Sequence, residues 1–129
     1  MKIVIKNIKQ NLIIQEFISN EPNSDIRVLV LGNKVIGSVR RMVPKGEFRS
    51  NHNRGGIFTE FKMNDEIEAL SIRAASVCGL EIAGIDFLET ENGFVILEVN
   101  SAPGFKGIEA IQKNDIATRI IEHIESNYH

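Results

Sequence analysis

The chain has 129 residues, enough to bury the core of one compact domain and too few for two. Its 43% hydrophobic and 25% charged residues are typical of an ordinary globular protein. The net charge of −2 favours no class of binding partner. Any site for phosphate or nucleic acid must therefore come from local clustering of charged residues. A single cysteine excludes an internal disulfide, and no apolar stretch approaches the roughly 20 residues that cross a bilayer, so we expect a cytoplasmic protein without membrane contact.

The first half of the chain predicts three strands. Residues 11–18, "NLIIQEFI", are apolar and β-prone, which predicts the first strand. In "IRVLVLGNKVIGSVRRMV" two β-branched runs flank Gly32-Asn33, which is typical of a hairpin with a two-residue turn. If Leu31 pairs with Lys34, the same register opposes Asp25 to Arg40 and Arg27 to Ser38.

A basic loop follows this hairpin. It contains a single acid, Glu47, and the glycines at 55 and 56 permit a close backbone approach to a ligand. Such a loop suits a polyanion, either a triphosphate or a nucleic-acid backbone, and the alternative is a loop that is merely solvated. The chain has no Walker A or GxGxxG motif, so P-loop and Rossmann nucleotide binding are unsupported. The five cations of the loop are Arg40, Arg41, Lys45, Arg49 and Arg54. After it, "IFTEFK" predicts a short strand.

Two helices are predicted in the second half. In "NDEIEALSIRAASVCG" Asp65 and Glu68 suggest a capping box, and Gly79 suits the position after the helix. The apolar stripe of this helix comprises Ile67, Leu70, Ala74, Val77 and Cys78, which makes the cysteine a packing residue. "NDIATRIIEHIESNYH" predicts a terminal helix. Its inward-facing residues would be Ile116, Ile120, Ile121 and Ile124.

Between the helices, "EIAGIDFLETENGFVILEVN" predicts a second hairpin. A three-residue loop, Glu91-Asn92-Gly93, would set Asp86 opposite Glu98, whereas a two-residue loop would break this arrangement. The same register opposes Gly84 to Asn100. Hairpins and two principal helices without a βαβ rhythm predict an α+β fold with a mainly antiparallel sheet.

The second hairpin also carries a set of oxygen ligands. Asp86, Glu98 and Asn100 would lie on one face of two apolar strands, where opposed like charges are destabilising. Mg²⁺ prefers carboxylate and amide oxygens and would remove the conflict. The alternative is a strand edge whose acids pair with Arg or Lys. The three histidines show no zinc-ligand spacing, and neither a G-x-S-x-G elbow nor an oriented Cys/His pair occurs, so hydrolase chemistry is not indicated.

Five collinear strings then suggest a family. "IIQEFI", "DIRVLVLGNKVIGSVRR", "GEFRSNHNRGG", "AGIDFLE" and "LEVNSAPGFKGIE" together resemble the C-terminal part of ATP-grasp ligases of the RimK type. The resemblance covers nearly the whole chain, which would form a single domain over residues 1–129. It implies the C-terminal half of an ATP-grasp fold. The other grasp subdomain, with the lysines that bind nucleotide phosphates, is expected upstream of Met1.

The resemblance implies a site for ATP and Mg²⁺ or Mn²⁺. The adenine would be held by the hinge residues Gln15, Glu16, Phe17 and Ile18, and the ribose would lie near Asp25. The phosphates would contact Arg49, Ser50 and Asn51, and the metal ligands would be Asp86, Glu98 and Asn100. Arg49 is the candidate catalytic residue that stabilises an acyl phosphate or tetrahedral intermediate, and Arg27 and Arg40 are candidates for binding a substrate carboxylate.

The implied reaction joins an amine to a carboxylate through an acyl phosphate. The expected partners are ATP, a carboxylate acceptor (a protein C-terminus or a small molecule) and an amino acid, with glutamate favoured; neither a membrane nor nucleic acid is among them. Self-association into a homo-oligomer is left open. We expect the isolated chain to bind ATP weakly and to turn over nothing, and Asp86→Ala to lose binding with the fold retained. The alternative is a noncatalytic RNA- or ribosome-binding module that uses the basic loop between Arg40 and Arg54.

Overall fold

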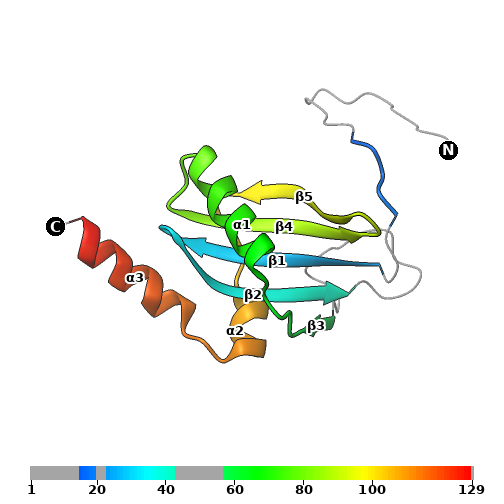
Figure 1. Cartoon of the computed structure of the whole chain (residues 1–129). Coiled ribbons are helices and arrows are strands. Elements are labelled where there is room, and N and C mark those ends of the chain that lie inside the picture. Colours follow the sequence, from blue (N-terminus) through cyan, green and yellow to red (C-terminus); the bar gives the residue numbers. More distant parts are fainter. Residues whose placement is uncertain (1–14, 20–22, 43–56, 129) are drawn as a thin grey trace, which may run out of the picture.

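One antiparallel sheet of five strands, in the order β3-β2-β1-β4-β5, organises the molecule (Figure 1). The computed structural model describes residues 15–19, 23–42 and 57–128. The elements are β1 (Ser24–Leu31), β2 (Lys34–Met42), β3 (Ile57–Thr59), α1 (Asp65–Val77), β4 (Ile82–Thr90), β5 (Gly93–Asn100), α2 (Lys106–Gln112) and α3 (Ile116–Asn127). The predicted α+β class and antiparallel sheet are confirmed, and α2 is an additional helix that the sequence did not predict.

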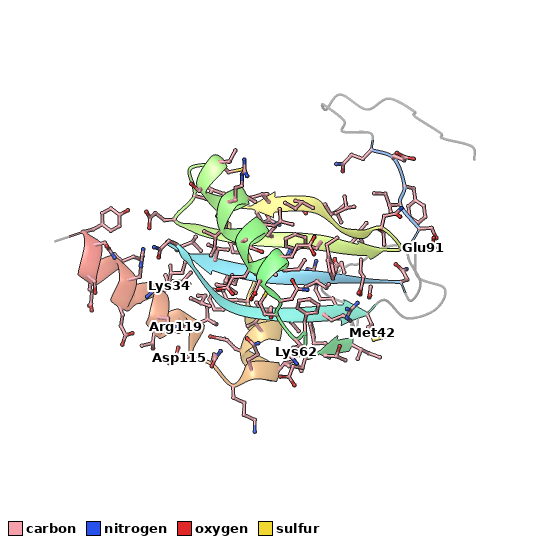
Figure 2. All side chains as sticks on the ribbon, viewed as in Figure 1. Lys34, Met42, Lys62, Glu91, Asp115 and Arg119 are labelled. Atoms are coloured by element: carbon pink, nitrogen blue, oxygen red, sulfur yellow. The ribbon has the colours of Figure 1, made fainter. Side chains whose placement is uncertain are left out.

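The two faces of the sheet carry separate apolar clusters. Because side chains alternate along a strand, Ile26 and Val28 of β1 pack toward α1 with Ile67, and Leu29 packs on the opposite face with Ile108 of α2. Figure 1 shows α1 lying across one face, and Figure 2 shows side chains filling the layer beneath it. The central strand β1 is therefore buried along its whole length.

The first hairpin contains a β-bulge that the sequence did not reveal. Leu31 pairs with Lys34 as predicted, but a bulge close to the turn moves every later pair by one residue. Asp25 therefore lies opposite Arg41 and not Arg40, and the predicted pair of Arg27 with Ser38 is replaced by Arg27 with Val39. Because a shift of one residue reverses the face of a side chain, Arg41 shares a face with Asp25, and Arg40 points to the other.

The second hairpin reaches its predicted pairing by a different route. Thr90 pairs with Gly93 across a two-residue turn, so the predicted three-residue loop is wrong. A bulge between Asp86 and Phe87 then supplies the missing residue, and Asp86 lies opposite Glu98 as predicted. Gly84 likewise lies opposite Asn100.

Several residues that were predicted to face the core from α1 and α3 are exposed. In α1 the buried residues are Ile67, Ser71 and Ala75, whereas Val77 is 79% exposed and Cys78 is also exposed. In α3 the first isoleucine, Ile116, is buried and Ile120 packs against the core, but Ile121 and Ile124 are exposed. Figure 1 shows that α3 continues past the sheet, and Val77 and Cys78 stand at the C-terminal end of α1.

The predicted strand over residues 11–18 is wrong for its described part. Residues 15–19 lie outside any helix or strand, and Phe17 is 72% exposed. Residues 15–19 are not part of the five-stranded sheet, and an apolar segment forms a strand only where a neighbouring strand accepts its backbone hydrogen bonds. No helix in the described ranges is long and apolar enough to cross a membrane.

The N-terminus of α1 gives a first testable prediction. The cap is Asn64, whose side-chain Oδ1 accepts a hydrogen bond from the Ile67 backbone N–H at 2.9 Å; the predicted cap, Asp65, is one residue off. Asn64→Ala is expected to lower the free energy of unfolding by about 1 kcal/mol, because it leaves that N–H without its partner. Asp65→Ala removes only a charge in the first turn and should lower the free energy of unfolding by at most about 0.5 kcal/mol. Urea unfolding measures both variants. Equal losses in the two variants would contradict the assignment.

Candidate functional site

A chain of two carboxylates and two guanidinium groups crosses the sheet on the face that packs against α2. Arg27 donates from Nε and Nη2 to the two oxygens of Asp86, at 2.8 and 2.7 Å. Arg41 donates from Nε and Nη2 to Asp25, at 2.6 and 2.5 Å, and its Nη2 also donates to Asp86 at 2.9 Å. The order is therefore Asp25, Arg41, Asp86, Arg27, spanning β2, β1 and β4.

Burial makes this chain of charges strongly interdependent. All four side chains are nearly inaccessible, with residue exposures of 3–7%. An isolated buried charge costs several kcal/mol, but here two negative and two positive groups balance. Removing one member would leave another without compensation, so the four residues form a single structural unit.

The same contacts shift ionisation equilibria. Burial by itself would raise the pKa of Asp86, but the hydrogen bond from Arg27 and the charge of Arg41 outweigh it and hold the pKa below the ordinary value of 3.8. Burial would lower the pKa of Arg41, and the hydrogen bond and charge of Asp25 outweigh this, so its pKa is raised and it stays charged. Asp86 and Arg41 therefore both carry their charges at neutral pH.

A pH dependence follows from the lowered pKa of Asp86. A carboxylate with a lowered pKa in the folded state contributes stability that is present above the unfolded-state pKa and is lost as the pH falls through the folded-state pKa. The free energy of unfolding should therefore fall as the pH is lowered from the ordinary value of 3.8. Carbon-13 NMR titration of the Asp86 carboxyl should give a pKa below 3.8. A value at or above that figure would contradict the ion pairs.

Next to this chain of charges lie the predicted metal ligands. Asp86 faces Glu98 across the β4–β5 pair, and Asn100 lies two residues further along the same face. Glu98 is exposed and Asn100 is half-buried. Neither side chain has a hydrogen-bonding partner among the residues that the structure describes, so both are free to bind a ligand.

The donor set fits a hard divalent cation. It offers two carboxylates and an amide oxygen, which are ligands that Mg²⁺ accepts. The arginines occupy three of about four acceptor positions on Asp86, so this residue has room for one further contact. Within residues 15–19, 23–42 and 57–128 no group of three His, Cys, Asp or Glu side chains could hold a metal by itself. A metal ion bound between Asp86 and Glu98 would therefore also need the amide oxygen of Asn100, and further ligands from an anion or water.

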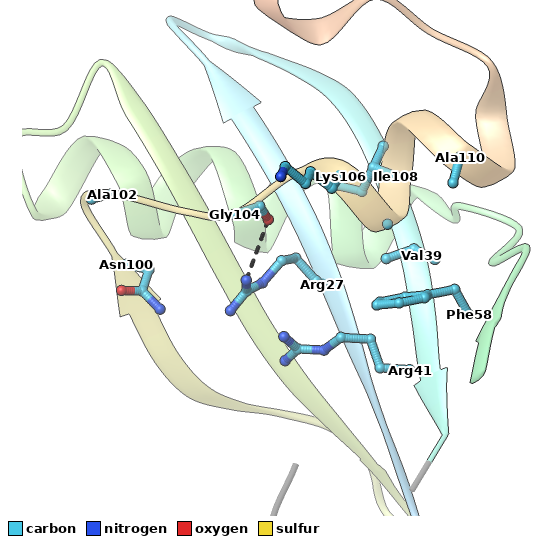
Figure 3. Close-up of a pocket in the computed structure, with 11 residues that line it drawn as sticks. Arg27, Val39, Arg41, Phe58, Asn100, Ala102, Gly104, Lys106, Ile108 and Ala110 are labelled. Atoms are coloured by element: carbon cyan, nitrogen blue, oxygen red, sulfur yellow. Dashed lines mark hydrogen bonds between the residues drawn. The ribbon is translucent and has the colours of Figure 1, made fainter. Parts of the chain in front are cut away.

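The turn after β5 is held against the site by close packing. Arg27 donates from Nη1 to the Gly104 carbonyl oxygen at 3.3 Å (Figure 3). A Cβ placed on Gly84, opposite Asn100, would lie 2.6 Å from the Cβ of Pro103. Glycine at position 84 thus lets the Ser-Ala-Pro-Gly turn pack directly over β4, which fixes where the strand end and Asn100 stand.

A pocket of about 600 Å³ opens beside this turn. Figure 3 shows Arg27, Arg41 and Lys106 among its lining, together with the amide of Asn100. An apolar part of the lining comes from β2, β3 and α2 and includes Val39, Phe58 and Ile108. Its size is that of small-molecule sites, and it adjoins both the chain of charges and the metal-ligand set.

The predicted site residues are not all brought together. Arg27 and Asp25 join the metal-ligand set through the chain of charges. Arg40 lies on the α1 face, where it donates to Glu89 at 2.7 Å and lies over the Phe61 ring. The hinge residues Gln15, Glu16 and Phe17 are exposed and Ile18 is half-buried, and none of them lines the pocket. Arg49, Ser50 and Asn51 lie outside the described residues.

Two cations that border the pocket, Arg41 and Lys106, are not among the site residues that the sequence predicts, although Arg41 is among the cations of the predicted basic loop. Arg41 stands directly after Arg40, and strand alternation requires that the two point to opposite faces, but only the bulge decides which one meets Asp25. Lys106 lies in α2, a helix too short to show helical periodicity. The adjacent pair of arginines was the available signal for Arg41, and no signal in the sequence marked Lys106.

Known proteins resemble this chain in sequence. Residues 1–124 match the RimK-like ATP-grasp domain. A probable alpha-L-glutamate ligase of Pseudomonas entomophila is 47% identical over 93% of this chain and 40% of its own length, and probable alpha-L-glutamate ligase 1 of Shewanella denitrificans is 48% identical over 93% and 41%. The chain thus spans about two fifths of the curated relatives that it matches.

Solved structures share the fold. The ATP-grasp ligase PsnB complexed with minimal precursor superposes with a TM-score of 0.67 at 25% identity, covering 87% of this chain and 35% of that one. PsnB complexed with minimal precursor, Mg and ADP gives a TM-score of 0.62 at 26% identity, covering 79% and 32%. The resemblance inferred from the five collinear strings is confirmed: the chain belongs to the RimK-like ATP-grasp family.

Proposed function

We propose that this chain is the metal- and nucleotide-binding part of an ATP-dependent carboxylate–amine ligase. The observation that carries the proposal is the arrangement of Asp86, Glu98 and Asn100 on one face at the end of the β4–β5 pair, beside a cationic pocket. Carboxylate and amide oxygens at such a place suit a cation that also binds phosphate oxygens. Membership of the RimK-like family and the names of the relatives support the same reaction.

The reaction would have two steps. A carboxylate oxygen takes the γ-phosphoryl group of ATP, which releases ADP and forms an acyl phosphate. The nitrogen of an amine then attacks the acyl carbon; the C–N bond forms, inorganic phosphate leaves and the amine loses a proton. A divalent cation, when bound, neutralises charge on the phosphates. Mg²⁺ is proposed first because a PsnB complex contains Mg with ADP, and Mn²⁺ offers the same oxygen preference.

The described residues have separate tasks in this proposal. Glu98 and Asn100 bind the cation, and Asp86 adds its remaining acceptor position. Arg27 holds Asp86 in place and borders the pocket, whereas Arg40 is engaged on the other face, so of these two predicted arginines only Arg27 stands beside a bound substrate. Arg49, Ser50 and Asn51 on the phosphates, and residues 15–18 on adenine, stay proposals that rest on the family resemblance.

The names of the relatives support a proposal for the substrates. Their printed name, alpha-L-glutamate ligase, favours glutamate as the amino acid, and the acceptor carboxylate would belong to a protein C-terminus or a small molecule. We place the reaction in the cytoplasm. None of the relatives or solved structures named above is described as binding RNA, so the alternative of an RNA- or ribosome-binding module has no support.

The test is an NMR titration of the chain with AMPPNP in the presence and absence of Mg²⁺. The largest Mg²⁺-dependent shifts are expected at Asp86, Glu98 and Asn100. Binding is expected to be weak, because the chain spans only about two fifths of its relatives. No shift at these residues with millimolar nucleotide and Mg²⁺ would contradict the proposal.

A further inference from the structure

The pocket is lined by more cationic than anionic side chains among the residues that the structure describes. Three cationic side chains, Arg27, Arg41 and Lys106, border it, and no carboxylate is among its described lining residues. Two of these charges are already compensated, since Arg27 pairs with Asp86 and Arg41 with Asp25. The pocket therefore presents one uncompensated positive charge.

That charge belongs to Lys106. Its side chain is exposed, and it forms no ion pair with any residue in the described ranges. Figure 3 shows it beside Gly104, on the same side of the strands as Arg27. A Lys ammonium with three donors and no partner in a pocket is suited to bind an anion of a ligand.

The backbone that carries Lys106 is fixed by packing. A Cβ on the next residue, Gly107, would lie 2.5 Å from Cε1 of the Phe58 ring, so α2 is seated closely on β3. Ile108 is fully buried beneath it. Lys106 therefore joins the pocket lining from a backbone held in place by packing, and its side chain is exposed.

The apolar residues of the pocket indicate what kind of ligand would carry the anionic group. Val39, Phe58 and Ile108 provide apolar surface, which suits the methylene groups of a short side chain. A volume of about 600 Å³ admits an amino acid and leaves room for a reacting partner. The combination of one free cation with an apolar wall suits a short chain that ends in a carboxylate.

We propose that Lys106 is a specificity-determining residue that selects a substrate with an extra carboxylate, as in an acidic amino acid, over its neutral isostere. The inference rests on the proposed function, since it assigns a ligand to the pocket beside the nucleotide and metal site. Arg27 positions the metal-ligand side of the pocket, and Lys106 binds the carboxylate at the other end of the substrate.

The experiment compares L-glutamate with L-glutamine, which has nearly the same shape and lacks the charge. Both are titrated into the chain, with Mg²⁺ and AMPPNP present, and followed by NMR signals of Ile108 and Ala110. The chain is expected to bind L-glutamate about tenfold more tightly, because a charge-assisted hydrogen bond is lost with the amide. Lys106→Gln should abolish this preference, and Lys106→Arg should retain it.

Lys113 provides a matched control. It lies at the other end of α2, is also exposed, and does not line the pocket, so Lys113→Gln changes the net charge equally and should leave the preference intact. An unchanged preference in Lys106→Gln, or no L-glutamate binding at millimolar concentration while AMPPNP still shifts Glu98 and Asn100, would overturn this inference alone. Loss of the nucleotide response as well would count against the proposed function.

Discussion

Arg41→Met is expected to lower the free energy of unfolding by about 3–5 kcal/mol, the cost of leaving buried charges without a partner. The arginine contacts Asp25 through both oxygens and also contacts Asp86, and its side chain is only 7% exposed. Its removal leaves Asp25 with no ion-pair partner among the described residues. Methionine keeps much of the volume, so the loss reports the charge and not a cavity. Urea unfolding at neutral pH measures it.

The neighbouring residue supplies the control for this prediction. Arg40 is also paired, but its partner Glu89 has a side chain that is 47% exposed, and exposed pairs contribute about 1 kcal/mol or less. Arg40→Met should therefore cost far less than Arg41→Met, although the two residues are adjacent in one strand. Similar losses would mean that the bulge does not place Arg41 in the buried chain of charges.

A double variant separates the charge from the packing. Asp25→Leu combined with Arg41→Met removes both members of one pair and leaves Asp86 with Arg27. Because no carboxylate is then left without a partner, the double variant should be more stable than Arg41→Met alone. A double variant that loses the sum of the two single losses would indicate that the two side chains act independently.

Glu98→Ala is expected to weaken Mg²⁺-dependent binding of AMPPNP by at least about 10- to 100-fold, since loss of groups at a metal site commonly has effects of this size. The same change should alter the free energy of unfolding by no more than about 0.5 kcal/mol, because the side chain is exposed. Isothermal titration calorimetry and urea unfolding on the same preparation measure the two effects. Glu91→Ala, in the turn of the same hairpin, removes an equal charge and should bind as the wild type does.

Glu98 is a cleaner target than Asp86. The sequence predicts that Asp86→Ala abolishes binding and retains the fold. The structure revises this design, because Asp86 is the acceptor for both Arg27 and Arg41. Its removal would leave the buried Arg27 without its ion-pair partner and Arg41 with Asp25 alone, so a loss of binding in that variant could not be distinguished from a loss of structure.

Much of the fold could be predicted because it depends on local signals. The Gly32-Asn33 turn and the alternation of apolar residues are enough to define the hairpins. The bulges are not visible in the sequence, since an extra residue in a strand leaves the local composition unchanged. One bulge made the predicted partner of Asp25 wrong, and the other restored the pairing of Asp86 with Glu98 despite a wrong loop length.

The candidate site, like the fold, could be predicted from the sequence only in part. The pairing that brings Asp86, Glu98 and Asn100 to one face could be predicted, and their role as metal ligands stays a prediction, which rests on the conflict between oxygen-bearing side chains and apolar strands. The buried arginines that resolve part of this conflict could not be assigned, because which of two adjacent residues faces the site depends on tertiary register. Lys106 was hidden for a further reason: the short helix α2 is stabilised by packing of Ile108 and Gly107 and not by a periodic sequence.

The central claim, that Glu98 and Asn100 bind a divalent cation together with the nucleotide, is tested most directly by replacing Mg²⁺ with paramagnetic Mn²⁺ in the AMPPNP complex and measuring the broadening of amide signals. We expect the strongest broadening at Glu98, Asn100 and Asp86, and we expect it to disappear in Glu98→Ala. Strongest broadening at the acidic first turn of α1, with Asp65, Glu66 and Glu68, or broadening that survives Glu98→Ala, would contradict the claim.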